Sequence, residues 1–425
     1  MWYDKIVLLF KNRELRNKFL IVVSLFIIFR IAANIPIPGI GAENLRRFFE
    51  QNQVFGLLNI FSGGALSNFS IILLGLGPYI TSTIILQLLT MIFPSLEKMY
   101  KEEGEAGRQK FNQYGRLLAI PLAALQGYGM LTLFQRQGVI TGLTPLVLIS
   151  SITTIVAGAM FLMWLGEIIT EQGMGNGISL LIFAGIVASL PMNIFQTFVT
   201  WDPSKIPSYV LFFALSLAII AGVVLITEAR RNIPVSYAKR VRGSKVYGGA
   251  STYLPLNVNP AGVIPIIFAL SILLLPGMIA GFFTGIQGSV GVIATTVNNF
   301  FNNQWVHGTL YFIFVIMFTY FYTAVTFNPK TIAENLQKMG GFIPGVRPGD
   351  STTKFLAHIL NRVLFTGAIS LGLIAVLPNI ISGATGVTGF TFLIGGTSLL
   401  IIVSVLLETM RTINAQLQMR EYDNF

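Results

Sequence analysis

Ten long apolar segments constrain the fold of this chain more than any other feature of its sequence. They lie roughly at 19–35, 70–93, 114–134, 144–169, 177–199, 207–228, 260–284, 308–328, 358–378 and 391–408. A hydrocarbon core about 30 Å thick requires roughly 20 apolar residues per helix, which these segments supply or approach. Runs such as SLLIFAGIVASL lack the alternation of barrel strands, and backbone in lipid must be hydrogen-bonded within helices or a closed barrel. We therefore predict an all-α integral membrane protein with ten transmembrane helices.

The basic residues predict the orientation of these helices. Of the 28 Lys and Arg residues, 23 lie in the two termini and one set of alternate loops, four lie in the opposite loops, and Arg30 lies within the first segment. The positive-inside rule then places both termini in the cytoplasm. This arrangement requires an even number of spans, which agrees with ten. Residues 1–18 are basic and amphipathic and suit the cytoplasmic membrane surface, and residues 411–425 form a cytoplasmic tail.

Several kinds of chemistry have no support in the sequence. The chain has no cysteine and two histidines, so it offers no disulfide, and we predict neither a metal nor a cofactor. It contains no H-E-x-x-H, G-x-S-x-G or phosphate-binding loop. The glycine-rich GMGNG at 173–177 follows no strand and precedes no Lys, which favours a tight hairpin between two spans.

The ionisable residues argue against ion-coupled transport. No segment has Asp, Glu, Lys or His at its centre, where proton and sodium relays need such groups. This pattern leaves a passive pathway, a receptor-like bundle or a channel powered by another component. A small-solute transporter would favour ionisable residues in mid-span, and a membrane-embedded enzyme would need a polar catalytic cluster that the sequence does not show.

Two long basic loops face the predicted cytoplasmic side. The loop at about 229–259 alternates Val and Tyr with Lys and Arg, which is typical of strands. The loop at about 329–357 predicts a short helix at 331–339 and then a turn that carries Arg347 between two prolines. These charges could only set topology. They could also form a docking surface for an acidic protein face or an RNA backbone.

The stretch NIFSGGALSNFS at 59–70 is apolar enough to enter a membrane but too short to cross it. Re-entrant backbone is tolerated where protein or a water-filled cavity surrounds it. Gly63 and Gly64 each weaken a helix by roughly 1 kcal/mol relative to Ala. The residues alone leave open whether this element is a fixed packing helix or a movable one.

Motifs along nearly the whole chain resemble the SecY family of channel subunits of bacterial protein translocases. In family order, from Pro36 to Ile401, they are IPIPGI, NIFSGGALS, PYITSTIILQLL, KEEGEAGRQK, FLMWLGEIITEQGMGNGIS, IFAGIVASLP, PVSYAKRVRGSKVY, LPLNVNPAGVIPIIFA, FNPKTIAENLQKMGGFIPGVRPG and GGTSLLI. The resemblance implies two five-helix halves of inverted pseudo-symmetry, at 19–200 and 207–410, with a hinge loop at 201–206. It also implies that the short stretch, at about 55–67, is a re-entrant plug helix that closes the pore. The plug residues are Asn59, Ile60, Phe61, Ser62, Gly63, Gly64, Ala65, Leu66 and Ser67.

The resemblance also assigns a pore ring and a lateral gate. The ring of aliphatic side chains is Leu76, Ile80, Ile182, Ile186, Ile267 and Ile401, where Leu76 replaces the usual isoleucine. Apolar rings can gate by excluding water. The gate residues are Thr81, Thr83, Gln87 and Asn259. The gate lies between the second and the seventh spans. Polar groups of this kind could hydrogen-bond from one span to the other and hold a seam that still opens, or they could serve only as ordinary packing contacts.

The resemblance implies a protein-conducting channel in the bacterial cytoplasmic membrane. Such a channel passes unfolded secretory polypeptides and releases hydrophobic segments into the membrane lipids. The expected partners are the SecE and SecG subunits, the SecA ATPase, the ribosome, and signal peptides with their preproteins. Motor or ribosome docking is expected at Lys239, Arg240, Arg242, Lys245 and Arg347. The chain itself is not expected to be an enzyme.

Overall fold

The structure is a computed structural model that describes residues 11–38, 62–66, 68–136, 138–140, 144–199, 203, 206–237, 240–242, 245–247, 251–283, 288–385 and 396–423. A helix occupies most of each of the ten predicted segments. These helices are α2 (Arg13–Ala32), α5 (Gly77–Ile92), α7 (Gly104–Arg136), α8 (Pro145–Glu171), α9 (Gly177–Val199), α10 (Ile206–Glu228), α11 (Ile264–Phe283), α13 (Gln304–Thr326), α15 (Asp350–Thr385) and α16 (Gly396–Asp423).

Not every helix is long and apolar enough to cross a bilayer within its described residues. Five meet that criterion, and α5 with α6 (Pro94–Lys101), bent by 111°, would supply a sixth span. Shorter apolar helices cover 177–191, 213–228 and 264–277. The protein is therefore a multi-pass helical bundle, and the number of ten spans stays a prediction.

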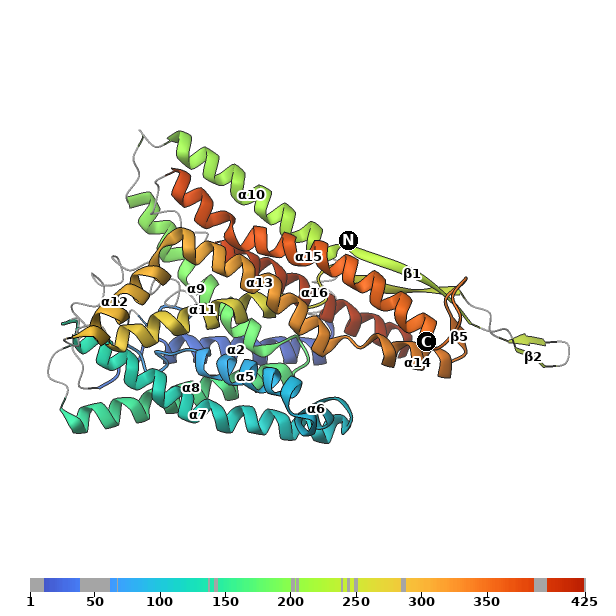
Figure 1. Ribbon diagram of the computed structural model, residues 1–425, viewed down its shortest axis with the longest axis horizontal. Coiled ribbons are helices and arrows are strands. Elements are labelled where there is room, and N and C mark those ends of the chain that lie inside the picture. Colours follow the sequence, from blue (N-terminus) through green and yellow to red (C-terminus); the bar gives the residue numbers. More distant parts are fainter. Residues whose placement is uncertain are drawn as a thin grey trace.

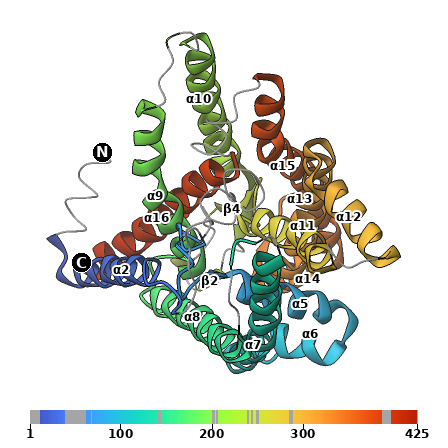
Figure 2. The ribbon, with the colours of Figure 1, turned by 90° about the vertical axis from the view of Figure 1, so that its left-hand side faces the viewer.

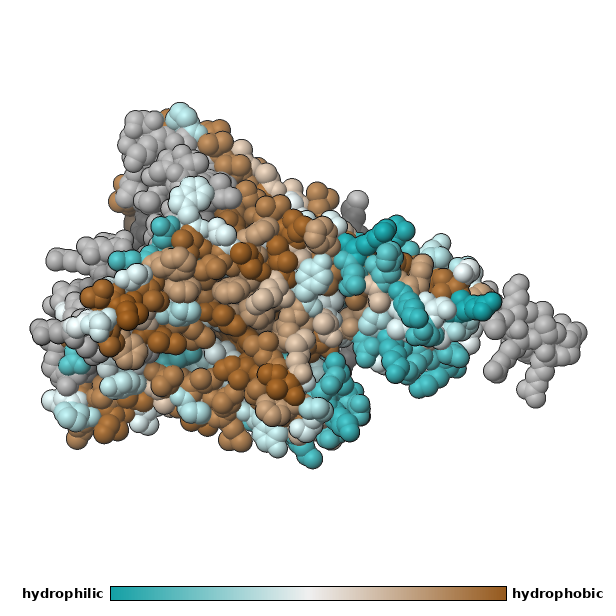
Figure 3. Space-filling model, viewed as in Figure 1, coloured by the Kyte–Doolittle hydropathy of each residue, from teal (hydrophilic) through white to brown (hydrophobic). Residues whose placement is uncertain are grey.

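The long helices run side by side along the long axis of the molecule (Figure 1). Strands β1 (Arg230–Tyr237) and β5 (Gly341–Phe342) and helix α14 (Pro329–Lys338) lie at one end, and α12 (Ser289–Asn302) lies at the other. Figure 3 shows apolar residues covering the bundle and hydrophilic residues gathered at the end with the strands. This separation agrees with a helical body in lipid and a polar end in the cytoplasm.

The second predicted span, 70–93, differs from its prediction at its start. Residues 68–76 form consecutive turns, and the helix begins only at Gly77. Phe69 has φ 49° and Gly75 has φ 56°, and a left-handed residue cannot continue a right-handed helix. The segment was predicted as a span from residue 70, but its backbone is irregular before Gly77, where protein surrounds it.

The described plug residues show the same kind of backbone. Residues 62–66 form turns rather than the continuous helix that we expected, because Gly63 and Gly64 adopt φ 67° and 84°. Asn59, Ile60, Phe61 and Ser67 lie outside the described residues, as does the rest of the predicted plug range before residue 62.

The helices before residue 200 pack chiefly among themselves, as do those after 206. In the first group α7 contacts α5 and α8, and α9 contacts α2 and α8. In the second group α13 contacts α11 and α15, and α16 contacts α10 and α15. The groups meet where α11 packs on α5 and α7 and where α16 packs on α9, around the centre of the end-on view (Figure 2). The predicted ring residues come from elements at these meeting points.

The two long basic loops fold into one unit instead of two separate ones. Strand β1 pairs antiparallel with β4 (Ser251–Asn257) on one side and with β5 from the second loop on the other. Helix α14, as predicted at 331–339, packs on this sheet. A small apolar core joins the parts; its buried members are Ile233, Val235, Leu256, Leu336, Ile343 and Leu356. The hairpin of β2 (Arg240–Arg242) and β3 (Lys245–Tyr247) extends beyond this sheet (Figure 1).

The GMGNG stretch forms the predicted turn, between α8 and α9. Gly173 and Gly175 adopt φ 72° and 135°, which favour glycine. The Gln416 side-chain amide on α16 donates a 2.6 Å hydrogen bond to the Gly173 carbonyl. The turn therefore also ties the last helix to the first group of helices.

Candidate functional site

The six predicted ring residues lie in one buried apolar cluster. Ile80 is on α5, Leu76 caps that helix, Ile182 and Ile186 are on α9, and the other two are on α11 and α16. Each side chain is at most 8 % exposed, and all six belong to the same cluster. Because the pairs on α5 and α9 are four residues apart, each pair shares one helix face. Segments that are far apart in sequence thus supply one apolar cluster that contains all six predicted ring residues.

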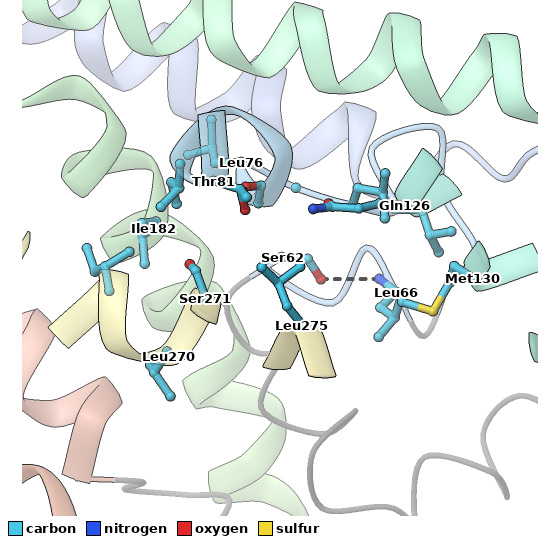
Figure 4. A pocket seen from close by; sticks show the side chains of 16 residues that line it. Ser62, Leu66, Leu76, Thr81, Gln126, Met130, Ile182, Leu270, Ser271 and Leu275 are labelled. Carbon is cyan, nitrogen blue, oxygen red and sulfur yellow. Dashed lines mark hydrogen bonds between the residues drawn. The ribbon is translucent and has the colours of Figure 1, made fainter. Parts of the chain in front are cut away.

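Two cavities border this apolar cluster. The smaller, of about 110 Å³, is lined by Ser62 and Leu66 of the plug and by the tips of the surrounding helices (Figure 4). The larger, of about 670 Å³, lies toward the loop between α5 and α7, on the predicted cytoplasmic side. Ile80 and Ile267 line both cavities. Two of the predicted ring residues therefore border both a small cavity that plug residues line and a larger polar cavity.

The larger cavity has a polar wall that the sequence analysis missed. Gln109, Asn112, Gln113 and Arg116 line it, and their spacing puts them on one face of α7. Arg116 Nε lies 2.6 Å from Glu167 Oε1 on α8. This periodic stripe was visible in QKFNQYGR and could have predicted a wetted helix face. Among the described residues, no group of three or more His, Asp or Glu side chains could hold a metal ion.

The described plug residues are packed in the interior. Ser62, Ala65 and Leu66 are 6 %, 0 % and 1 % exposed. The Leu66 amide donates to Ser62 Oγ at 3.3 Å, a bond that appears in Figure 4. A Cβ on Gly63 would lie 3.0 Å from Gly185 Cα and 3.0 Å from Phe29 Cζ, so only glycine fits there. The plug is thus seated against α2 and α9.

Two sets of hydrogen bonds join this segment to α2 and the residues after it. The Ile37 amide donates to the Phe69 carbonyl, and the Ile71 amide donates to the Ile35 carbonyl, both at 2.9 Å. Nearer the centre, Arg30 Nη1 donates to the Gly63 carbonyl. The sequence analysis did not predict a partner for Arg30.

Of the predicted gate residues, Thr81, Thr83 and Gln87 lie on α5 and Asn259 precedes α11, and three of these side chains donate local hydrogen bonds. Thr81 Oγ1 donates to the Gly77 carbonyl and Thr83 Oγ1 to the Tyr79 carbonyl, each at 2.9 Å within α5. Asn259 Nδ2 donates to the Gly262 carbonyl at 3.0 Å. The bonds that these three side chains donate therefore do not cross the seam in the way we expected, because the nearby helix or turn carbonyls satisfy the donors first.

Two amide oxygens at the gate are left without partners. Gln87 Oε1 and Asn259 Oδ1 are buried and accept no hydrogen bond from the described part of the chain. Gln87 also lines the larger cavity. Buried acceptors of this kind cost free energy until a donor reaches them.

The predicted docking residues occupy the polar end. Arg240 and Arg242 lie in β2 and Lys245 in β3, and Lys239 lies outside the described residues. Arg347 is exposed in the turn after β5. Its carbonyl accepts a 2.9 Å hydrogen bond from Thr352 Oγ1, which fixes that turn to the start of α15.

Comparisons with known proteins agree on one family. The family model described as SecY matches residues 70–410. The protein translocase subunit SecY of Streptomyces scabiei is 41 % identical over 431 residues, with 98 % of each chain covered.

Solved structures with low sequence identity share the fold. One described as a protein-conducting channel is 20 % identical with a TM-score of 0.65, covering 94 % of this chain and 91 % of its own. Sec61 in a canine ribosome–channel complex from the endoplasmic reticulum is 18 % identical with a TM-score of 0.61, at the same coverage.

Proposed function

The chain belongs to the SecY family, and on this premise we propose that it is the channel subunit of a protein translocase. It passes unfolded secretory polypeptides across the bacterial cytoplasmic membrane and releases hydrophobic segments sideways into the lipid. One observation carries the proposal: two cavities, one lined by plug residues and one with a polar wall, share Ile80 and Ile267 of the apolar cluster. Adjoining cavities of this kind favour a passage over a closed binding pocket.

The chemistry of the constriction suits a substrate of variable sequence. Aliphatic side chains contact any passing residue without a directional bond, so they do not retain the polypeptide. The same side chains exclude water and hydrated ions when the passage is empty. The polar wall of the larger cavity keeps an extended backbone hydrated before it enters the constriction.

Sideways release takes place between α5 and α11. The two helices pack together there. The buried Gln87 and Asn259 oxygens lack partners within the described residues, so polar contacts between these side chains do little to hold the seam closed. An apolar signal helix replaces the packing of α5 on α11 by burying its own surface in the opened seam. The halves at 19–200 and 207–410 separate about the loop at 201–206 in this step.

The folded cytoplasmic unit receives the motor. It presents Lys239, Arg240, Arg242, Lys245 and Arg347 to SecA or to the ribosome, whose RNA backbone and acidic surfaces attract basic groups. SecA supplies ATP hydrolysis, for which this chain has no sequence motif, and SecE and SecG complete the membrane complex. A structural relative was solved in a ribosome–channel complex, which supports the ribosome as a partner.

Site-specific photocrosslinking tests the proposal. A photoreactive residue at position 80 or 267 should crosslink to a secretory polypeptide stalled during transport, because both positions line both cavities. The matched control is position 88 on the same helix, where Leu88 is 36 % exposed on the outside of α5. Crosslinks at position 88 with none at 80 and 267 would place the polypeptide outside the bundle and refute the proposal.

A further inference from the structure

Arg30 is the basic residue that lies inside the first predicted span. It lies in the last turn of α2. A long cationic side chain near a helix end commonly extends toward the membrane surface. In the structure it turns inward instead, and Nη1 donates a hydrogen bond to the carbonyl of Gly63. The acceptor is a plug residue, so the contact joins a fixed helix to an element that closes the passage.

The backbone at Gly63 makes this carbonyl available. Gly63 has φ 67° and begins a series of turns, so its carbonyl is not committed to a continuous helix. The close approach of Gly63 to Phe29 and to Gly185 brings the plug backbone against α2, one residue before Arg30. A hydrogen bond from a charged donor is roughly twice as strong as one between neutral groups. Arg30 thus makes a strong contact at the point of closest packing.

A second attachment differs in kind. Residues 68–71 bond to residues 34–37 through backbone amides and carbonyls and through Asn68 Nδ2, which donates to Asn34 Oδ1 at 3.1 Å. The Pro36–Ser70 pair forms an antiparallel bridge in the same place. Several bonds hold this end, whereas a single described side chain reaches the carbonyl of Gly63. The attachment at 68–71 is therefore suited to act as a pivot, and the bond from Arg30 to Gly63 is suited to be released.

We propose that Arg30 is the latch that holds the plug in the closed position. Its guanidinium keeps Gly63 seated against Phe29 and Gly185, and release of this bond lets residues 62–66 turn away about the attachment at 68–71. The Arg30 side chain remains partly exposed in the closed state. After release it is hydrated or meets lipid headgroups, so opening leaves no buried unpaired charge. Arg30 is therefore a positioning residue for closure and does not contact the polypeptide.

Thiol labelling measures the position of the plug directly. The natural chain has no cysteine, so Ser62→Cys introduces a single thiol at a position that is 6 % exposed when the plug is seated. The labelling rate with a membrane-impermeant maleimide is measured in reconstituted full-length protein without substrate. We expect Arg30→Met to raise this rate on the order of tenfold or more, as loss of a hydrogen bond from a charged donor implies. Arg30→Gln keeps a neutral donor and should give an intermediate rate.

The control is Ile27→Met, which places the same side chain on an exposed position of α2. It should label at the unmodified rate. A labelling rate that increases from the unmodified protein to Arg30→Gln and then to Arg30→Met supports the latch. A wild-type rate in Arg30→Met would overturn it, as would equal acceleration by Ile27→Met. If Arg30→Met fails to insert, a wild-type rate in Arg30→Gln overturns it equally.

A second measurement links the latch to closure. Only this leak measurement rests on the proposed channel function. The labelling rate reports the position of the plug even if the protein conducts nothing. Arg30→Met should increase the resting leak of small anions from proteoliposomes in proportion to its labelling rate. Faster labelling without leak would support the latch and count against the channel; normal labelling with a high leak would overturn the latch alone.

Discussion

Ile80 and Ile267 illustrate how single residues acquire a role that their type does not predict. An isoleucine in an apolar segment faces lipid or packs against a neighbour in most cases. Here each is 8 % exposed and borders two cavities. Family resemblance selected these positions; periodicity placed Leu76 and Ile80 on one face but could not tell which face meets the passage. Arg30 shows the reverse case, because its charge was conspicuous in the sequence while its partner was not.

A polar substitution at the constriction should make the resting channel leak. Ile80→Ser replaces an aliphatic side chain that excludes water with one that binds it. It also removes buried apolar surface worth about 1.5–3 kcal/mol for a fully buried side chain. We expect a higher ion leak in proteoliposomes and transport of precursors with defective signal sequences. Leu88→Ser, on the outer face of α5, is the control. A leak equal in both variants would contradict a special role for Ile80.

At the scale of elements, the structure departs from the prediction in the buried, glycine-containing turns before α5. The segment at 70–93 was predicted from its apolar length, yet only Gly77–Ile92 is helical. Left-handed residues at 63, 64, 69 and 75 break the backbone into turns. Hydropathy reports that a segment avoids water and not its backbone geometry, so the apolar segment was predicted but not the residue at which its helix begins. The helix at 331–339, by contrast, has Asn328 as a capping acceptor and Pro329 at its start.

Fixing the plug to the opposite wall should stop transport. Ser62 and Ser271 of α11 line the same small cavity (Figure 4), so Ser62→Cys with Ser271→Cys should be joined by a short cleavable bifunctional maleimide. We expect precursor import into vesicles to cease after bridging and to return after cleavage of the linker, because the plug must leave the passage. Each single-cysteine variant treated with the same reagent serves as the control. Undiminished import by the bridged protein would refute a moving plug.

On the scale of the whole molecule, the helical bundle and its polar end have different roles. The bundle carries the passage, and the strands and α14 form a separate small core at the end that carries most of the loop charge. The ion pair of Arg411 with Glu228, at 2.8 Å, ties the cytoplasmic end of α16 to the end of α10 next to β1. This contact connects the polar end to two helices of the second group.

Charge reversal at the polar end should abolish partner binding while leaving the bundle intact. Arg347→Glu, alone or with Arg240→Glu, repels the acidic or phosphate surfaces that basic groups attract. We expect loss of binding to SecA or to ribosomes in flotation assays, with normal membrane insertion and thermal stability. Lys354→Glu is the matched control, since that side chain is 79 % exposed on the neighbouring helix α15. If binding is unchanged by Arg347→Glu and Arg240→Glu together, the docking role is contradicted and these charges serve only to set the membrane topology.

The sequence by itself determined the helical class, the order of the segments and the family, and it predicted the sidedness of the loops, because hydropathy, charge and motifs are local quantities. Only the tertiary structure decided that six aliphatic residues from four parts of the chain form one cluster and that two cavities meet at Ile80 and Ile267. It also decided that the two loops share one sheet and that Arg30 reaches Gly63. These facts depend on which faces of distant helices meet, and that is settled by packing among all of them at once.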